Sequence, residues 1–382
     1  MTTNKLLKIV SRTVWMLVAC SPAIALAEQE FSLKPFLEVR QRFEDNVLQV
    51  PAENGPQSDF VTNIWAGVDI KLRLDEKNRL AARYEAAPRR FAEVSEKNRQ
   101  DHLLSVLFRR HLRRNVTFLT IGNLGLRSQP DEPINEYFKW DAAAQIHVRW
   151  TPLWSSQIGA EFRNKYYPDN KDATYISRMV EGMLQRRIGT ISRVRGGYQL
   201  RTYDGAIDPR VLVSDLSRDM DGIRQTATVG VESLLFGQVL MDWKYQIEVD
   251  IAERELQRHE RLAREREQTG EFGGEHDGDD DEDVDFNFTT HRVATLLIWR
   301  LASKSTASLS ARHDLKSFRD WLVPVKNRQR RDNWTLLRLF LKQELAPSWS
   351  VRLEYTLEKN NSNDPTQEYT DNAYSIRLQF GF

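Results

Sequence analysis

The final stretch of the chain, residues 371–382, alternates between two kinds of side chain. Successive side chains of an extended strand point to opposite faces, so a period of two sorts residues by face. One face here is made of Tyr374, Ile376, Leu378, Phe380 and Phe382, and the other is small or polar. The pattern predicts a strand with one apolar and one wet face, although an edge strand of a soluble sandwich would show it too.

Two longer stretches, 60–74 and 239–251, show the same alternation and separate these alternatives. In the first, eight alternate positions from Phe60 to Leu74 carry no charge. That run is long for a sandwich strand and suits a tilted membrane strand, which needs about 9–11 residues in the apolar layer. The repetition of such stretches along the chain favours a transmembrane barrel.

Strands and connections follow one plan along the whole chain. Sixteen segments show strand character, at 35–44, 60–74, 78–88, 99–111, 115–126, 139–150, 154–166, 173–187, 191–203, 223–235, 239–251, 287–300, 306–316, 333–345, 349–359 and 371–382. Short connections alternate with long ones at 45–57, 89–98, 127–138, 167–172, 204–222, 252–286, 317–332 and 360–370. Outer-membrane barrels have short periplasmic turns and long outer loops. We therefore predict an all-β fold, a closed antiparallel transmembrane barrel of about sixteen strands in the bacterial outer membrane.

Composition excludes two other classes of protein. No apolar run outside the N-terminus is long enough to cross a bilayer as a helix. The 55 basic and 54 acidic side chains leave a formal net charge of +1, whereas a nucleic-acid-binding protein should be strongly basic. We expect outer-membrane lipid, and no nucleic acid, as a partner.

The first 27 residues have the features of an export signal. A basic start is followed by the apolar stretch 13–19, and Ala25-Leu-Ala27 supplies small residues before a cut. Residues 28–382 would then form a single barrel domain. The one cysteine, Cys20, lies inside the signal, so the mature chain would have no disulfide. An alternative is that the sequence around Cys20 is a lipoprotein cleavage site and Cys20 is acylated.

The polar faces of the strands would surround the lumen. Their cations are Arg40, Arg42, Lys71, Arg73, Arg83, Arg149, Arg163, Arg193, Arg195, Arg201, Arg292, Arg312, Arg352 and Arg377. The carboxylates on those faces are Glu38, Asp69, Glu85, Glu161, Asp242, Glu248, Asp250, Glu354 and Glu358. The excess of these fourteen cations over the nine carboxylates predicts a pore wall that favours anions. The other interpretation is a set of cross-strand ion pairs that keep the wall hydrated and rigid.

Signals of catalysis or of a bound cofactor are lacking. None of the seven histidines lies in a Gly-x-Ser-x-Gly or His-Glu-x-x-His motif. There is no glycine-rich phosphate loop and no zinc ligand set. Residues 252–286 read as a long charged extracellular loop, and the acidic run 277–285 within it lacks the spacing of an EF-hand. We expect no enzyme activity, no cofactor and no metal.

Several short motifs resemble a known family. They are Phe43-Glu-Asp-Asn-Val-Leu, Ser58-Asp-Phe, Gly67-Val-Asp, Leu80-Ala-Ala-Arg-Tyr84 and the end of the chain from Tyr374 to Phe382. Together they resemble β-barrel porins associated with exopolysaccharide operons, from which the chain departs at Glu44 and in the loop 252–286. The resemblance implies export of a polysaccharide across the outer membrane, with separate periplasmic export proteins as partners.

The last strand also resembles the closing strand of outer-membrane barrels, whose terminal aromatic residue is read by the barrel-assembly machinery. Tyr374, Phe380 and Phe382 are the expected assembly signal. Two alternatives to export stay open. One is a general or anion-preferring porin for small solutes, and the other is a non-conducting barrel that binds something at the cell surface.

Overall fold

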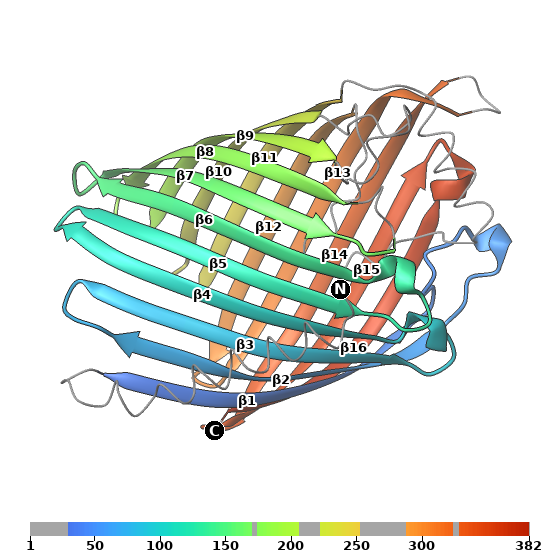
Figure 1. Ribbon diagram of the computed structural model, residues 1–382, viewed down its shortest axis with the longest axis horizontal. Helices are drawn as coiled ribbons and strands as arrows, with labels where there is room; N and C mark the ends of the chain where they lie inside the picture. Colours follow the sequence, from blue (N-terminus) through green and yellow to red (C-terminus); the bar gives the residue numbers. More distant parts are fainter. Residues whose placement is uncertain (1–29, 170–173, 206–221, 253–287, 324–327, 382) are drawn as a thin grey trace.

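The chain folds into a single closed antiparallel barrel (Figure 1). This computed structural model describes residues 30–169, 174–205, 222–252, 288–323 and 328–381. The sixteen strands are β1 Phe31–Glu44, β2 Asp59–Arg73, β3 Asn78–Phe91, β4 Arg99–Arg113, β5 Val116–Ser128, β6 Tyr137–Arg149, β7 Trp154–Tyr166, β8 Tyr175–Ile188, β9 Ser192–Gly205, β10 Gly222–Leu235, β11 Val239–Ala252, β12 Phe288–Ala302, β13 Ser305–Val323, β14 Arg328–Ala346, β15 Trp349–Ser362 and β16 Tyr369–Gly381. Each pairs with its sequence neighbours, and β1 pairs with β16, which confirms the predicted fold class.

The two ends of the barrel differ in their connections. The short turns 74–77, 114–115, 150–153, 189–191, 236–238, 303–304 and 347–348 lie at one end, which we call the short-turn mouth. The strand order places the start of β1 and the end of β16 there too. The remaining connections lie at the opposite end, the long-loop mouth. Short three-residue 3-10 turns occur in several of them, as at Ala52–Asn54 and Pro365–Gln367.

One predicted loop is wrong. Residues 317–332 were expected to connect two strands, but β13 and β14 extend through most of this segment and make a hairpin longer than its neighbours (Figure 1). The pairing shifts register between Ser317 and Leu322. Beyond the apolar layer a strand needs no apolar face, so the sequence there does not alternate and gives no strand signal.

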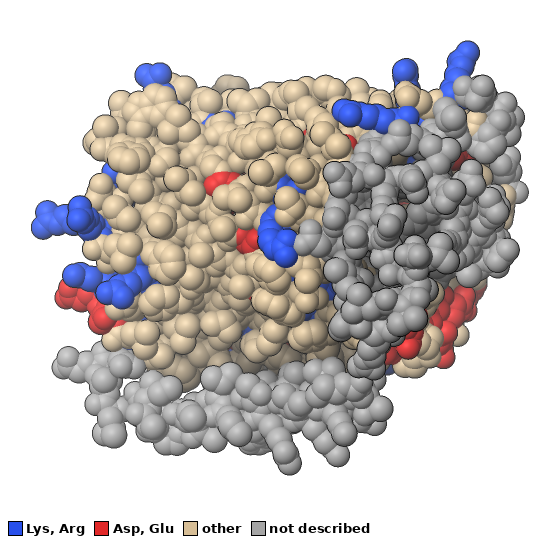
Figure 2. Space-filling model, turned by 45° about the horizontal axis from the view of Figure 1, so that its top comes forward, with Lys and Arg blue, Asp and Glu red and all other residues tan. Residues whose placement is uncertain are grey.

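Apolar side chains cover the outside of the barrel. Ile158, Val180 and Tyr374 are 65%, 55% and 56% exposed, and they alternate with interior polar positions. Figure 2 shows this outer surface as a mostly uncharged band between the two ends. Among the described residues no helix is long and apolar enough to span a membrane.

The first long loop, 45–58, packs against the inner side of the long-loop mouth. A small buried apolar cluster joins it to β2 and β3 through Val47, Val61, Phe91 and Val94. Asp59, at the start of β2, accepts hydrogen bonds of 2.9–3.1 Å from the backbone N–H groups of residues 92–94. These contacts connect two neighbouring loops and fix that side of the mouth.

Four predictions fall wholly or mostly outside the described residues. They are the signal at 1–27 with Cys20, the connection at 204–222 apart from its ends, the charged loop at 252–286 apart from its first residue, and Phe382.

Candidate functional site

The structure places all fourteen sequence-predicted cations on the interior side of the wall. In each strand they occupy the positions that alternate with the exposed apolar residues. Arg40 lies opposite Arg377, for example, whereas the flanking Val39 lies opposite Leu378 on the outer side. Some of them are buried, as Arg40, Arg163 and Arg201 are, and others are partly exposed.

Strand register aligns interior cations into one continuous row. Each residue of this row lies directly opposite the next one on the neighbouring strand. In order, the residues are Arg300, Thr306, Lys342, Arg352, Arg377, Arg40, Asn63, Arg89 and Arg99. We call the cations of this row the basic track: Arg300, Lys342, Arg352, Arg377, Arg40, Arg89 and Arg99.

The basic track runs from one mouth to the other. Arg300 lies two residues before the short-turn end of β12, and Arg99 is the first residue of β4 at the long-loop end. Arg377 and Arg40 lie between them at intermediate depth. The row climbs because barrel strands tilt against the axis, so a line across them spirals along the wall.

Carboxylates and aromatic rings flank the middle of the track. Arg377 is 3.0 Å from Glu38, and Arg352 is 3.0 Å from Glu354. The guanidinium groups of Arg40 and Arg377 both lie over the Trp65 ring, at 5.1 and 5.3 Å. Stacking on an aromatic face stabilises a cation by attraction to the negative face of the ring.

Like charges directly opposite one another across strands are destabilising. The track nevertheless places Lys342, Arg352, Arg377 and Arg40 side by side on four adjacent strands. Lys342 and Arg300, at its short-turn end, make no ion pair with any described residue. The wall therefore carries more positive charge along this line than its own carboxylates neutralise.

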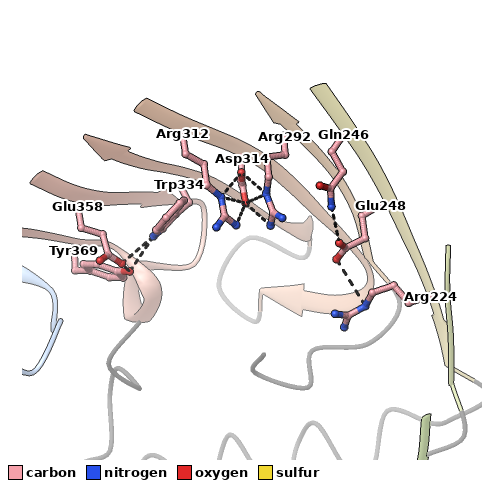
Figure 3. Close-up of polar contacts among 9 residues, drawn as sticks. All are labelled: Arg224, Gln246, Glu248, Arg292, Arg312, Asp314, Trp334, Glu358 and Tyr369. Carbon is pink, nitrogen blue, oxygen red and sulfur yellow. Dashed lines mark hydrogen bonds and ion pairs between the residues drawn. The ribbon is translucent and has the colours of Figure 1, made fainter. Parts of the chain in front are cut away.

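A second group of charges lies on the wall from β10 to β16 (Figure 3). Arg292 and Arg312 both bind the carboxylate of Asp314, with Nη2–Oδ2 distances of 2.9 and 2.6 Å. Because two guanidinium groups share one carboxylate, this group keeps a positive charge. In the same view Arg224 lies 3.7 Å from Glu248.

A glycine makes room for another cation of this wall. The side chain of Arg195 lies over Gly230, where an added Cβ would come within 2.9 Å of its Nε atom. From there Arg195 reaches Asp242 with two bonds of 2.6 and 2.8 Å. Lys244 lies directly opposite Gly230 on one neighbouring strand and directly opposite Ala294 on the other. Small residues therefore alternate with long cations from strand to strand across this part of the wall.

A girdle of stacked cations and aromatic rings inside the long-loop mouth was not predicted from the sequence. Lys316 lies over the rings of Phe288 and Phe318 at 4.1 and 4.8 Å, and Arg224 lies over Phe288 and Tyr203 at 5.1 and 5.0 Å. The three aromatic side chains are buried. A sequence signal exists, because basic and aromatic residues stand two apart in 89–91, 165–167, 201–203 and 316–318.

Two of the described histidines pair with tyrosines on the outer face of the barrel. His102 and His291 face outward, and their Nδ1 atoms lie 2.8 and 2.9 Å from the hydroxyl oxygens of Tyr84 and Tyr245. No group of three potential metal-binding side chains occurs within the described part of the chain. His259 and His276 lie outside it.

The aromatic residues of the last strand are partly described. Tyr374 is exposed on the outer face, and Phe380 packs edge-on against Trp349 with ring centroids 4.1 Å apart. Their role as an assembly signal stays a prediction.

Comparison with known proteins shows the fold. No protein-family model and no curated protein matches the sequence. Among solved structures, OccAB3 of Acinetobacter baumannii matches 92% of this chain and 99% of its own, with 6% identity and a TM-score of 0.51. The match to an anion-selective porin from Comamonas acidovorans covers 93% of this chain and 100% of that porin, with 9% identity and a TM-score of 0.45. The match to a bacterial polysaccharide outer membrane secretin covers 92% of this chain and 98% of that secretin, with 9% identity and a TM-score of 0.47.

Proposed function

We propose that this protein is an outer-membrane channel whose basic interior conducts anionic solutes. The basic track carries this proposal, because it runs along the interior wall from mouth to mouth. A barrel of sixteen strands is wide enough for an aqueous passage. Cations along a low-dielectric wall lower the cost of bringing an anion inside.

Membrane insertion follows from the outer surface. A closed barrel leaves no unpaired strand edge, which is the condition for crossing a bilayer with strands. The outward apolar side chains supply the surface that contacts lipid. Since tight turns face the periplasm in such barrels, the short-turn mouth is the periplasmic one.

The substrate class we favour is an acidic polysaccharide on its way out of the cell. Cations next to aromatic rings suit it, because charged groups on sugars would meet guanidinium groups while sugar rings stack on aromatic faces. Trp65 beside Arg40 and Arg377, and Phe340 3.9 Å from Arg352, provide this pairing. The motifs shared with porins of exopolysaccharide operons point the same way. Periplasmic export proteins and the barrel-assembly machinery are the proposed partners.

The second candidate is an anion-preferring porin for small solutes. The partly exposed side chains of Arg352 and Arg377 favour it as much as they favour export, since small anions would meet the same groups. Deleting the gene separates the two. Loss of secreted polysaccharide is the expected result, and unchanged polysaccharide would leave only the small-solute porin.

Ion selectivity in planar bilayers tests the channel itself. Under a salt gradient, the wild type should conduct and its reversal potential should show a preference for chloride over potassium. Arg352→Gln with Arg377→Gln should weaken that preference, because two cations leave the middle of the track. Arg110→Gln, an exposed position on the outer side of β4, is the control and should change nothing. A wild-type protein that inserts but never conducts would contradict the proposal.

A further inference from the structure

The short-turn mouth carries two rows of arginines that face one another in register. Arg73 lies opposite Arg79, and Arg79 lies opposite Arg109, on β2, β3 and β4. Arg187 lies opposite Arg193 on β8 and β9. All five are on the interior side, and directly opposite Cβ atoms are about 4.5–5.5 Å apart. We call them the inner-rim arginines.

Most of this charge is not neutralised. Arg73 lies 3.4 Å from Glu30, and Arg193 lies 3.7 Å from Glu232. Among the described residues, the other three inner-rim arginines have no ion pair. Five cations minus two carboxylates leaves three positive charges. Exposed pairs such as that of Glu30, which is 79% exposed, are weak in any case.

Other charges near this mouth do not reverse the balance. The β2–β3 turn adds Asp75 and Glu76 beside Lys77, but the Asp75 carboxylate is already bound by donors of its own turn. On the other side of the mouth, the basic track begins with Arg300 and Lys342. Both Lys or Arg and Asp or Glu side chains are visible at this end of the molecule, at the left in Figure 2.

The long-loop mouth is built differently. Among the described residues on the interior side of that mouth, several cations are buried and matched to carboxylates, as Arg330 is to Asp332 at 2.6 Å and Arg224 to Asp250 at 3.0 Å. Arg79, Arg109 and Arg187 at the short-turn mouth have no such carboxylate partner among the described residues. Like-charged rows are unfavourable by themselves, so an anionic ligand would stabilise them.

We propose that the inner-rim arginines capture a polyanionic chain, an acidic polysaccharide with charged groups on successive sugars, as it reaches the short-turn mouth. The two rows lie on separate arcs of the barrel (Figure 1). A small anion would contact one row, whereas a chain with repeated charges spans both. The captured chain then meets Arg300 and Lys342 at the start of the basic track. The direction of movement rests on the proposed channel function, but the binding does not.

Phospholipid headgroups are the competing source of negative charge. They would be met by arginines on the outer side of the same rim, Arg110 and Arg186, of which Arg186 lies 5.2 Å from the Trp154 ring. The inner-rim arginines are on the other face of the same strands. Their placement favours a ligand that enters the lumen.

Equilibrium binding of a fluorescent oligogalacturonate to the full-length protein in nanodiscs tests the capture site. Arg79→Gln, Arg109→Gln and Arg187→Gln together should weaken binding by about tenfold, as expected for the loss of three exposed charges. The matched control is Arg110→Gln with Arg186→Gln on the outer side, which should bind like the wild type. Arg79→Lys, Arg109→Lys and Arg187→Lys together should bind like the wild type, which separates lost charge from misfolding. Neutral maltoheptaose should not bind.

Three results would overturn the capture site. They are equal loss of binding in the inner and outer variants, unchanged binding in the inner variant, and loss of binding on adding phosphatidylglycerol to the nanodiscs, which would assign the rim to lipid. Bilayer conductance of the same preparations is scored separately. A protein that binds the oligogalacturonate but does not conduct would refute the channel and leave the capture site standing.

Discussion

At the scale of single residues, the interior wall depends on how closely long side chains can lie against the backbone. Phe36 crosses Gly67 on the neighbouring strand and receives the guanidinium of Arg83 on its ring at 4.2 Å. A Cβ on Gly67 would come within 2.7 Å of the Phe36 ring and would collide with the carbonyl oxygen of Tyr84. A glycine is therefore needed at position 67, because there is no room for a Cβ atom.

Replacing Gly67 tests this packing. Gly67→Ala should destabilise the barrel by about 1–3 kcal/mol, the usual cost of overpacking. The measurement is the midpoint of urea unfolding in lipid, followed by tryptophan fluorescence. Gly182→Ala is the control, because a Cβ there meets no atom within 4 Å. Equal stability of Gly67→Ala and the wild type would show that the Phe36 ring and the backbone at Tyr84 both move aside without cost.

At the scale of elements, the turn between β2 and β3 is organised by one carboxylate. Asp75 accepts hydrogen bonds of 2.7 Å from the backbone N–H groups of Lys77 and Asn78, and one of 2.6 Å from the Asn78 side chain. The Asn78 amide and then these N–H groups hold the pKa of Asp75 below its usual value of 3.8. Such a lowered pKa contributes stability above the unfolded-state pKa, and the contribution is lost as pH falls through the folded-state pKa.

Asp75→Ala should therefore lower stability at neutral pH, and the difference from the wild type should shrink once the pH falls below 3.8. Urea midpoints across this range measure it. Glu76→Ala, at a neighbouring exposed position whose side chain accepts no hydrogen bond from a described residue, is the control and should leave the urea midpoint at neutral pH unchanged. A difference that persists unchanged at the lowest pH would mean that the carboxylate charge does not matter to the turn.

The β13–β14 hairpin is joined to β15 by amide side chains. Asn363 accepts from the Arg331 N–H at 2.7 Å and donates to the Gln329 carbonyl oxygen at 2.8 Å. Asn363→Ala removes both bonds, each worth about 0.5–1.5 kcal/mol, so trypsin should cleave after Arg328 and Arg331 roughly tenfold faster. Asn361→Ala is the matched control, since its side chain makes no hydrogen bond to a described residue. Equal cleavage rates in the two variants would contradict the role of Asn363.

The strands were predictable from the sequence because each one faces two different environments. The apolar set in 60–74 and the polar set opposite it are both on the expected sides. The strand prediction failed where the two sides of a strand no longer face different environments. Beyond the apolar layer, 317–332 need not alternate, and in β4 the interior positions include Leu103, which is 41% exposed, so the alternation there is broken.

At the scale of the whole molecule, the basic track could not be predicted from the sequence. Arg40, Arg352 and Arg377 were each predicted to face inward, but their alignment depends on the offsets between strands, which alternation does not encode. Arg89 and Arg99 lay at the uncertain edges of a predicted loop. Only the closed register joins these residues, distant in sequence, into one line.

We infer that the apolar sides of the strands contact lipid and that the charged sides surround water. Cysteine labelling in a Cys20→Ser background, with the protein in lipid bilayers, tests it most directly. A membrane-impermeant anionic thiol reagent should modify Arg352→Cys and Arg377→Cys rapidly and leave Ile158→Cys and Val180→Cys unmodified. Rapid modification of the last two, with the first two protected, would contradict the account.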